Sequence, residues 1–166
     1  IVESALAESG LPPGRLELEI TETVLAANEG VSELLEALAY RGVHIALDDF
    51  GTGYSNLAAL QRLPISVLKI DRSLVSNIDR RQGDAIIARA MIQLAHTLEM
   101  SVIAEGVETE AQRDALRDFD CDEYQGYLFT PPLAPAKLEP LLLAHAARMA
   151  AGDVLADPAR RAATKA

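Results

Sequence analysis

The 166-residue sequence contains a single cysteine, Cys121, so an intrachain disulfide is impossible and a reducing compartment is indicated. Cys121 stands between Asp120 and Asp122, an acidic setting that raises the pKa of a thiol. We therefore expect a structural cysteine and not a nucleophile. With three histidines and no cysteine pair, the composition also argues against a zinc site.

The sequence lacks any run of about 18 apolar residues, so we expect no membrane-spanning segment and no membrane contact. Its first residues lack the basic stretch and apolar stretch of a secretory signal peptide, and we expect a cytoplasmic protein. The chain has 15 Lys and Arg residues and 25 Asp and Glu residues, so its net charge is −10. This balance argues against a nucleic-acid partner, but it permits a small phosphorylated ligand if metal cations mediate the contact.

Apolar residues make up 49% of the chain and charged residues 24%, which is ordinary for a globular domain with one core. Hydrophobic periodicity predicts short strands that alternate with helices, and this alternation is typical of βα units in a parallel sheet. We expect one domain over residues 1–150 and a disordered tail over 151–166. The expected strands are 16–22, 43–48, 66–71, 101–105 and 124–129, and the expected helices are 2–9, 31–38, 57–63, 84–99, 109–119 and 136–150.

Functional side chains stand at the carboxyl end of each expected strand. No glycine-rich loop of the dinucleotide or P-loop type follows any of these strands. In a (β/α) barrel all these ends meet at one face, where catalytic groups gather. Taken alone, the adjacent Asp48 and Asp49 are equally consistent with the start of a solvated turn. The side chains concerned are Glu19 and Glu22, Asp48 and Asp49, Lys69 and Asp71, Glu105 and Glu108, and Gln125.

A cluster of this many carboxylates requires cations, because like charges repel and raise each other's pKa. Hard oxygen ligands favour Mg²⁺ or Mn²⁺. A bridging carboxylate such as Asp48 could hold two ions about 3.5–4 Å apart, an arrangement suited to phosphodiester hydrolysis. Lys69 could then hold the attacking water or offset the negative charge that develops.

Five strings at the strand ends carry a family resemblance. They are Leu-Glu-Ile-Thr-Glu (18–22), Leu-Asp-Asp-Phe-Gly-Thr-Gly-Tyr-Ser (47–55), Leu-Lys-Ile-Asp-Arg-Ser (68–73), Ala-Glu-Gly-Val-Glu-Thr (104–109) and Gln-Gly-Tyr-Leu-Phe (125–129). These strings occur in the same order, through about residues 1–140, as in the family that they resemble. That family is the EAL domain, the family of cyclic di-GMP phosphodiesterases. The resemblance implies a TIM-like (β/α) barrel, of which this chain holds five βα units. It also implies a bacterial signalling role, including biofilm control, through hydrolysis of cyclic di-GMP to linear pGpG with two Mg²⁺ or Mn²⁺ ions.

The resemblance also implies roles for individual residues. Glu19, Asp48 and Asp49 match metal ligands of the family, and Asp48 matches the acid shared by both ions. Lys69 matches the lysine that contacts the catalytic water. Glu105 resembles the acid proposed as the general base or as a ligand that holds the water.

Other residues near these strings have more than one interpretation. Glu22 matches the glutamate that anchors the Asp-Phe-Gly loop, and Glu108 and Gln125 complete the family's site. Asp71 is as consistent with fixing a loop as with touching the substrate. Arg72 could contact a phosphate, but an arginine in such a place is more often solvated. Three tyrosines could stack on guanine, although packing is expected for at least two of them: Tyr54, Tyr124 and Tyr127.

The family's namesake Glu-Ala-Leu motif, an arginine near it and the asparagine of the following strand are expected before Ile1. Five strands cannot close an eight-stranded barrel. We therefore expect the N-terminal strands to lie outside this chain and the chain alone to be inactive, which turnover of cyclic di-GMP by the purified chain would refute. The alternative functions are a cyclic di-GMP receptor or interaction scaffold without turnover and, on fold analogy alone, an enzyme for another phosphate ester. The resemblance also makes a homodimer an expected assembly.

Overall fold

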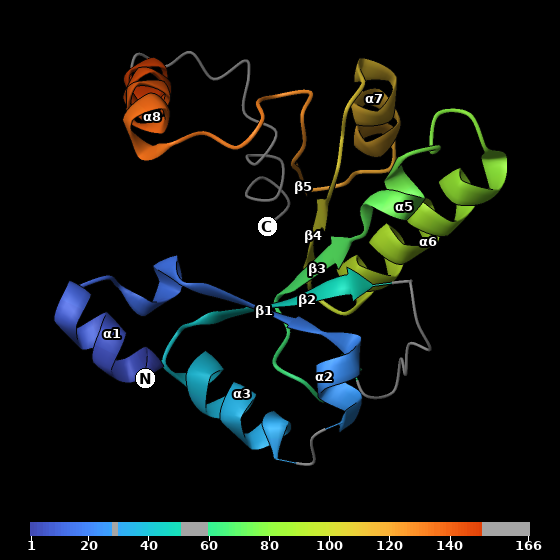
Figure 1. Ribbon diagram of the computed structural model, residues 1–166. Helices are drawn as coiled ribbons and strands as arrows, with labels where there is room; N and C mark the ends of the chain where they lie inside the picture. The colour runs from blue at the N-terminus through green and yellow to red at the C-terminus, as the bar shows by residue number, and fades with distance from the viewer. Residues whose placement is uncertain (28–29, 51–59, 151–166) are drawn as a thin grey trace.

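The computed structural model describes residues 1–27, 30–50 and 60–150. It contains a five-stranded sheet in which every neighbouring pair of strands is parallel, with the order β1-β2-β3-β4-β5 (Figure 1). This confirms the predicted α/β class. The strands are β1 (Glu17–Thr21), β2 (His44–Phe50), β3 (Val67–Ile70), β4 (Ser101–Ala104) and β5 (Glu123–Tyr124).

The winding of the chain is that of a barrel wall. Because strand order follows sequence order, each crossover steps the same way, and right-handed crossovers then leave their helices on one side of the sheet. Helices α3 (Val31–Tyr40), α6 (Gln82–Thr97) and α7 (Glu110–Asp118) follow the outer side of the curved sheet in Figure 1. A doubly wound sheet would instead reverse its strand order and carry helices on both faces.

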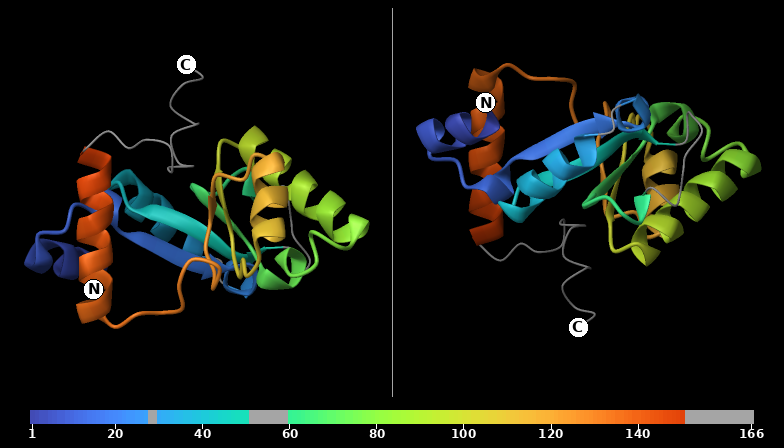
Figure 2. Two further views of the ribbon diagram at one scale, coloured as in Figure 1. Left: turned by 90° about the horizontal axis from the view of Figure 1, so that it is seen from above. Right: turned by 90° about the horizontal axis from the view of Figure 1, so that it is seen from below.

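The remaining helices directly follow strands or lie at one end of the molecule. Figure 2 shows α1 and α8 at this end, and α6 and α7 at the opposite end. Among the described residues, no helix combines the length and the apolarity that crossing a membrane requires. The remaining helical elements are α1 (Val2–Ser9), the 3₁₀ turn η1 (Pro13–Arg15), α2 (Glu22–Ala27), α5 (Arg72–Val75) and α8 (Pro135–Ala150).

The core lies between the sheet and the helices that follow its outer side. All four residues of β3 are buried, and β2 is buried continuously from Ile45 to Leu47. Ile92 of α6 and Leu116 of α7 are fully buried and belong to the same core cluster. This packing fixes the central strands and therefore the side chains at their ends.

The predicted strand over residues 124–129 is wrong in length, because β5 ends at Tyr124. The backbone after it bonds to the loop that follows β4: Val107 donates to the Gln125 carbonyl at 3.0 Å, and Leu128 donates to the Val107 carbonyl at 3.0 Å. A side chain at Gly126 would place its Cβ 2.2 Å from the Val107 carbonyl oxygen, so this close approach requires glycine. The chain turns here instead of extending the ladder.

Other boundaries differ less. The helix predicted over 84–99 is α6, which spans Gln82–Thr97. The short helix α5 was not predicted at all. Residues 57–59 of the predicted helix at 57–63 and the whole predicted tail at 151–166 lie outside the described residues, and residues 61–63 form a turn and a bend instead of the predicted helix.

Candidate active site

Lys69 of β3 lies at the centre of a cluster of carboxylates. Its side chain is 6% exposed, and its Nζ lies 2.6 Å from Oε1 of Glu19, 2.8 Å from Oε1 of Glu105 and 3.3 Å from Oδ1 of Asp48. Glu19 belongs to β1, Asp48 to β2, and Glu105 directly follows β4. The structure therefore brings together side chains from four strand ends that are up to 86 residues apart, from Glu19 to Glu105.

The carboxylates explain why an ammonium group is tolerated inside the sheet. Burial alone would lower the pKa of Lys69, but hydrogen bonds to Glu105 and Glu19 and the charges of Glu105 and Asp48 raise the pKa above its usual 10.5. Lys69 is therefore a permanent cation at neutral pH. Among the described residues, only Lys69 and Gln112 are polar side chains classed as buried.

A β-bulge sets the positions of the two adjacent aspartates. The pairing of β2 with β3 shifts register between Leu47 and Phe50, and Asp49 between them has φ 57°, in the left-handed region. The Asp49 backbone N–H donates to Oδ1 of Asp48 at 3.0 Å, which helps to fix the Asp48 carboxylate beside Lys69. The Asp49 residue is exposed and does not join the contacts of Lys69.

The other predicted site residues surround the cluster at different distances. Nε2 of Gln125 donates to Oε1 of Glu105 at 2.7 Å, so Gln125 holds the carboxylate that also bonds Lys69. Glu108 binds Arg72 instead, with 2.7 Å between Oε1 and Nη2. Glu22 begins α2 immediately after β1.

Asp71 caps a helix that the sequence did not predict. It is the N-cap of α5, and its Oδ1 accepts a hydrogen bond from the Ser73 backbone N–H at 2.9 Å. Hydrogen bonding from the Ser73 side chain, and to a smaller extent from the backbone N–H groups of Ser73 and Arg72, lowers the pKa of Asp71. Of the two interpretations of Asp71, the structure gives contacts for the one in which it fixes a loop.

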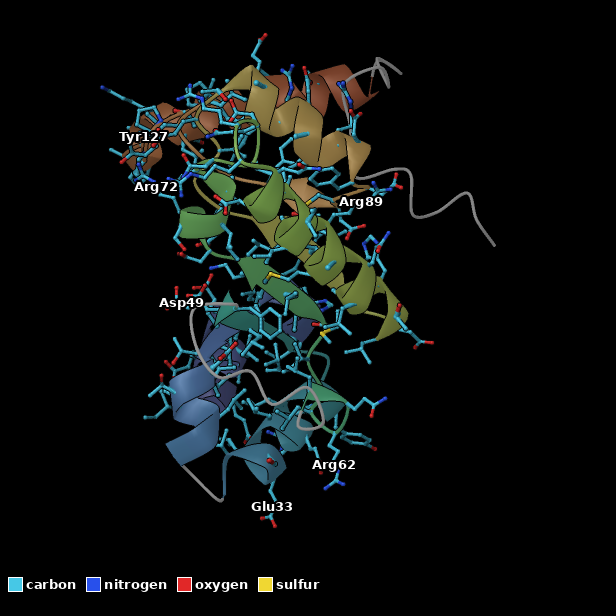
Figure 3. All side chains as sticks on the ribbon, turned by 90° about the vertical axis from the view of Figure 1, so that its right-hand side faces the viewer. Glu33, Asp49, Arg62, Arg72, Arg89 and Tyr127 are labelled. Carbon is cyan, nitrogen blue, oxygen red and sulfur yellow. The ribbon has the colours of Figure 1, made fainter. Side chains whose placement is uncertain are left out.

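A cavity of about 520 Å³ lies beside the cluster. Glu105 and Gln125 line it, so the cavity adjoins the Lys69 contacts. Figure 3 shows Asp49, at the end of β2, on the same side of the molecule as Arg72 and Tyr127 of the cavity lining. Its lining residues are Arg72, Glu105, Gly106, Glu108, Gln125, Gly126, Tyr127, Thr130, Pro131, Pro132, Leu133 and Leu138.

Gln112 is a further residue near the site whose full set of contacts the sequence did not predict. With Thr109 it forms a capping box at the start of α7. In addition, its Oε1 accepts from the Glu108 backbone N–H at 2.8 Å, and its Nε2 donates to the Ser76 carbonyl at 3.1 Å. Gln112 thus ties the loop after β4 to the end of α5.

Two further side chains outside the cluster have defined surroundings. Nε2 of His96 lies 2.8 Å from Oδ2 of Asp122. Cys121 is buried, and burial together with the charge of Asp122 raises the pKa of its thiol to about 12. A thiol with this pKa is a poor nucleophile at neutral pH, in agreement with a structural cysteine.

The chemistry of the cluster suits a hard divalent cation, because Glu19, Asp48 and Glu105 offer only carboxylate oxygens. Their present arrangement is directed at Lys69. Within the part of the chain that the structure describes, no group of three or more His, Cys, Asp or Glu side chains is arranged to hold a metal ion. The oxygen atoms of the cluster are therefore of the kind that binds such an ion. In the present arrangement, the ammonium group of Lys69 is the positive charge at the centre of the cluster.

The site lies where (β/α)-barrel enzymes carry their catalytic groups, at the carboxyl edge of a parallel sheet wound in one direction. A family model for the EAL domain matches residues 1–132, and the chain belongs to the EAL domain family. The literal string Glu36-Ala37-Leu38 has no part in the site, because it lies within helix α3 and not at a strand end.

Named relatives agree with this assignment. The chain is 48% identical over 145 residues to the cyclic di-GMP phosphodiesterase NbdA of Pseudomonas aeruginosa, covering 87% of this chain and 18% of NbdA. It resembles the solved PaMucR phosphodiesterase in complex with c-di-GMP, with 43% identity and a TM-score of 0.78 over 82% of this chain and 56% of that one.

A third comparison is the manganese and cyclic di-GMP complex of Klebsiella pneumoniae BlrP1. Here the identity is 32% and the TM-score 0.74, over 79% of this chain and 34% of that one. The chain spans between 16% and 20% of the length of the first three curated relatives it matches.

Proposed function

We propose that this chain contributes the cluster around Lys69 to the active site of a phosphodiesterase that hydrolyses cyclic di-GMP to linear pGpG with two divalent ions, Mg²⁺ or Mn²⁺. The observation that carries the proposal is the convergence of Glu19, Asp48 and Glu105 on Lys69 at one edge of the sheet. The names of NbdA and of the PaMucR complex support the substrate, and the manganese complex of BlrP1 supports a divalent ion.

Glu19, Asp48 and Asp49 are the residues that would hold the ions. When bound, divalent ions neutralise phosphate oxygens and lower the pKa of a coordinated water. Oxygen ligands and the surplus of carboxylates over ammonium in the cluster suit that task. Asp49 would approach from the exposed end of β2, where the bulge carries it away from Lys69.

Glu105, Gln125 and Lys69 would handle the proton of the attacking water and the negative charge on the phosphate. Hydrolysis adds one water to phosphorus and breaks one P–O bond, so a base accepts a proton from the water and the leaving oxygen gains one. Glu105 is the base in this proposal, held in place by Gln125. Lys69 donates hydrogen bonds to the water and offsets the negative charge that develops on the phosphate.

Glu19 and Glu17 provide a matched pair for testing the proposal, because they are both exposed glutamates on one face of β1. In the full-length protein, we expect Glu19→Gln to lower kcat for cyclic di-GMP by at least about a hundredfold, since it removes a carboxylate that contacts Lys69. Glu17→Gln should stay within about twofold of the wild type. Chromatography of substrate and pGpG measures both rates.

Equal activity of the two variants would contradict the proposed site. Binding of cyclic di-GMP by the wild type without any pGpG would replace the enzyme with the receptor function. We further propose that the protein acts in the cytoplasm as a homodimer, in bacterial signalling that includes biofilm control. Sedimentation of the full-length protein as a monomer at all concentrations would contradict the homodimer.

A further inference from the structure

Gln112 is a buried amide that lies behind the wall of the cavity. It is the third residue of α7 and is 5% exposed, and both polar atoms of its side chain are hydrogen-bonded. Its Oε1 accepts from the backbone N–H groups of Glu108, at 2.8 Å, and Thr109, at 3.0 Å. Its Nε2 donates to the Ser76 carbonyl at 3.1 Å. One side chain therefore joins the loop after β4 to the end of α5.

Both of the elements that Gln112 joins carry residues of the cavity wall. Arg72 begins α5, and Glu105, Gly106 and Glu108 lie in the loop after β4. All four of these residues line the cavity, whereas Gln112 is not among the described residues that line it. Gln112 thus holds the backbone of the wall from behind, without reaching the space where a ligand would lie.

An ion pair joins the same two elements on the side that faces solvent. Nη2 of Arg72 lies 2.7 Å from Oε1 of Glu108, and the side chains are 62% and 43% exposed. The stem of Arg72 crosses Gly106, where an added Cβ would lie 2.4 Å from Cγ of Arg72. Exposed ion pairs contribute little, whereas hydrogen bonds shielded from water are stronger. Gln112 is therefore the firmer of the two connections between the walls.

The proposed base, Glu105, is anchored separately from Gln112. The Glu105 backbone N–H donates to the Ile70 carbonyl at 3.0 Å, which continues the ladder between β3 and β4. Its side chain contacts Lys69 and Gln125. None of these contacts involves Gln112, so a loss of the Gln112 hydrogen bonds would loosen the wall and leave the Lys69 cluster in place.

We infer that Gln112 is a positioning residue that fixes the separation of the two cavity walls and through it sets the affinity for cyclic di-GMP. Without its side chain, two backbone N–H groups and one carbonyl group lose their partners. The loop after β4 and α5 would then sample a wider range of separations, and ligand binding would include the entropic cost of ordering them. This inference rests on the proposed cyclic di-GMP substrate.

The test replaces Gln112 by methionine in the full-length protein, because methionine has a similar length and lacks the amide. We expect KM and Kd for cyclic di-GMP to rise about tenfold, since the walls are no longer preorganised. In contrast, kcat should change less than about threefold, because Lys69 and Glu105 keep their contacts. Steady-state rates and equilibrium binding measure the two effects.

Hydrogen exchange without ligand provides a second measurement of the same variant. The amides of residues 106–112 should exchange about tenfold faster in Gln112→Met than in the wild type, since Glu108 and Thr109 lose the acceptor of their N–H groups. Mass spectrometry of peptides from the full-length protein measures this exchange, and the result does not depend on the substrate.

Thr109→Ala is the matched control, because it removes the other half of the capping box. The Thr109 Oγ1 accepts from the Gln112 backbone N–H at 3.2 Å, whereas the three hydrogen bonds of the Gln112 side chain do not use it. Loss of this N-cap should lower the melting temperature by a few degrees and leave KM and Kd at wild-type values. The comparison separates the stability of α7 from the position of the walls.

An unchanged Kd or unchanged exchange in Gln112→Met would overturn the inference, as would an equal rise in Kd in Thr109→Ala or a fall in kcat at constant KM. If the methionine variant does not fold, Gln112→Asn takes its place under the same criteria, since its amide is one methylene too short to reach both walls. A wild type that binds cyclic di-GMP without turnover contradicts only the proposed hydrolysis, and Kd still tests Gln112. A wild type that does not bind it contradicts both proposals.

Discussion

Replacing Lys69 by methionine is expected to lower kcat for cyclic di-GMP hydrolysis in the full-length protein by about a thousandfold. The ammonium lies within 3.3 Å of three carboxylates from three other strand ends, so its loss removes both a positioned donor and the charge that holds the cluster together. Loss of one preorganised donor in an active site costs about 10²–10³ in kcat. Steady-state rates of pGpG formation provide the measurement.

Lys137→Met is the matched control, because Lys137 is exposed on α8 and is not among the residues that line the cavity. Its rate should equal that of the wild type. Thermal unfolding of Lys69→Met separates a chemical effect from loss of structure, since removing one partner of a buried ion pair also destabilises a protein by about 3–5 kcal/mol. A folded Lys69→Met variant with wild-type kcat would exclude Lys69 from the reaction.

Changing Glu105 to glutamine is expected to have a similarly large effect, a fall in kcat of about 10²–10⁴. The substitution keeps the size of the side chain and removes its ability to accept a proton from water. Because Gln125 already donates to Oε1 of Glu105, the amide of the variant has a position to occupy, and KM should change little. Initial rates across a range of cyclic di-GMP concentrations separate kcat from KM.

Glu110→Gln is the control for this change, because Glu110 is 77% exposed at the start of α7 and its nearest cation, Arg113, is 3.8 Å away. It should retain full activity. The kcat of Gln125→Ala should fall between the values for Glu105→Gln and Glu110→Gln, since this change removes only the residue that holds Glu105. If Glu105→Gln keeps more than about a tenth of the wild-type kcat, another group is the base.

The strand ends could be predicted from the sequence because local patterns define them. Apolar runs ending in carboxylates predicted β2 and the end of β4, and parallel βα winding predicted that Glu19, Asp48 and Glu105 would share an edge. These features depend on the period of a strand and on the handedness of crossovers, both of which a sequence contains.

Contacts between distant loops could not be predicted in the same way. The ion pair of Arg72 with Glu108 joins residues 36 positions apart, and it depends on the space left by Gly106, whose φ no local pattern specifies. The helix α5 has four residues, too few for a periodic signal, so the capping role of Asp71 was not evident. The short length of β5 likewise depends on a long-range approach, that of Gly126 to Val107.

The central claim is that the carboxylates around Lys69 bind divalent ions for hydrolysis of cyclic di-GMP. The most direct test follows pGpG formation by the full-length wild type and by Asp48→Asn, in EDTA and after Mn²⁺ is added back. The account predicts that EDTA abolishes pGpG formation by the wild type, that Mn²⁺ restores it, and that Asp48→Asn stays at least about a hundredfold slower at any Mn²⁺ concentration. Unchanged turnover in EDTA, or a fully active Asp48→Asn, would contradict it.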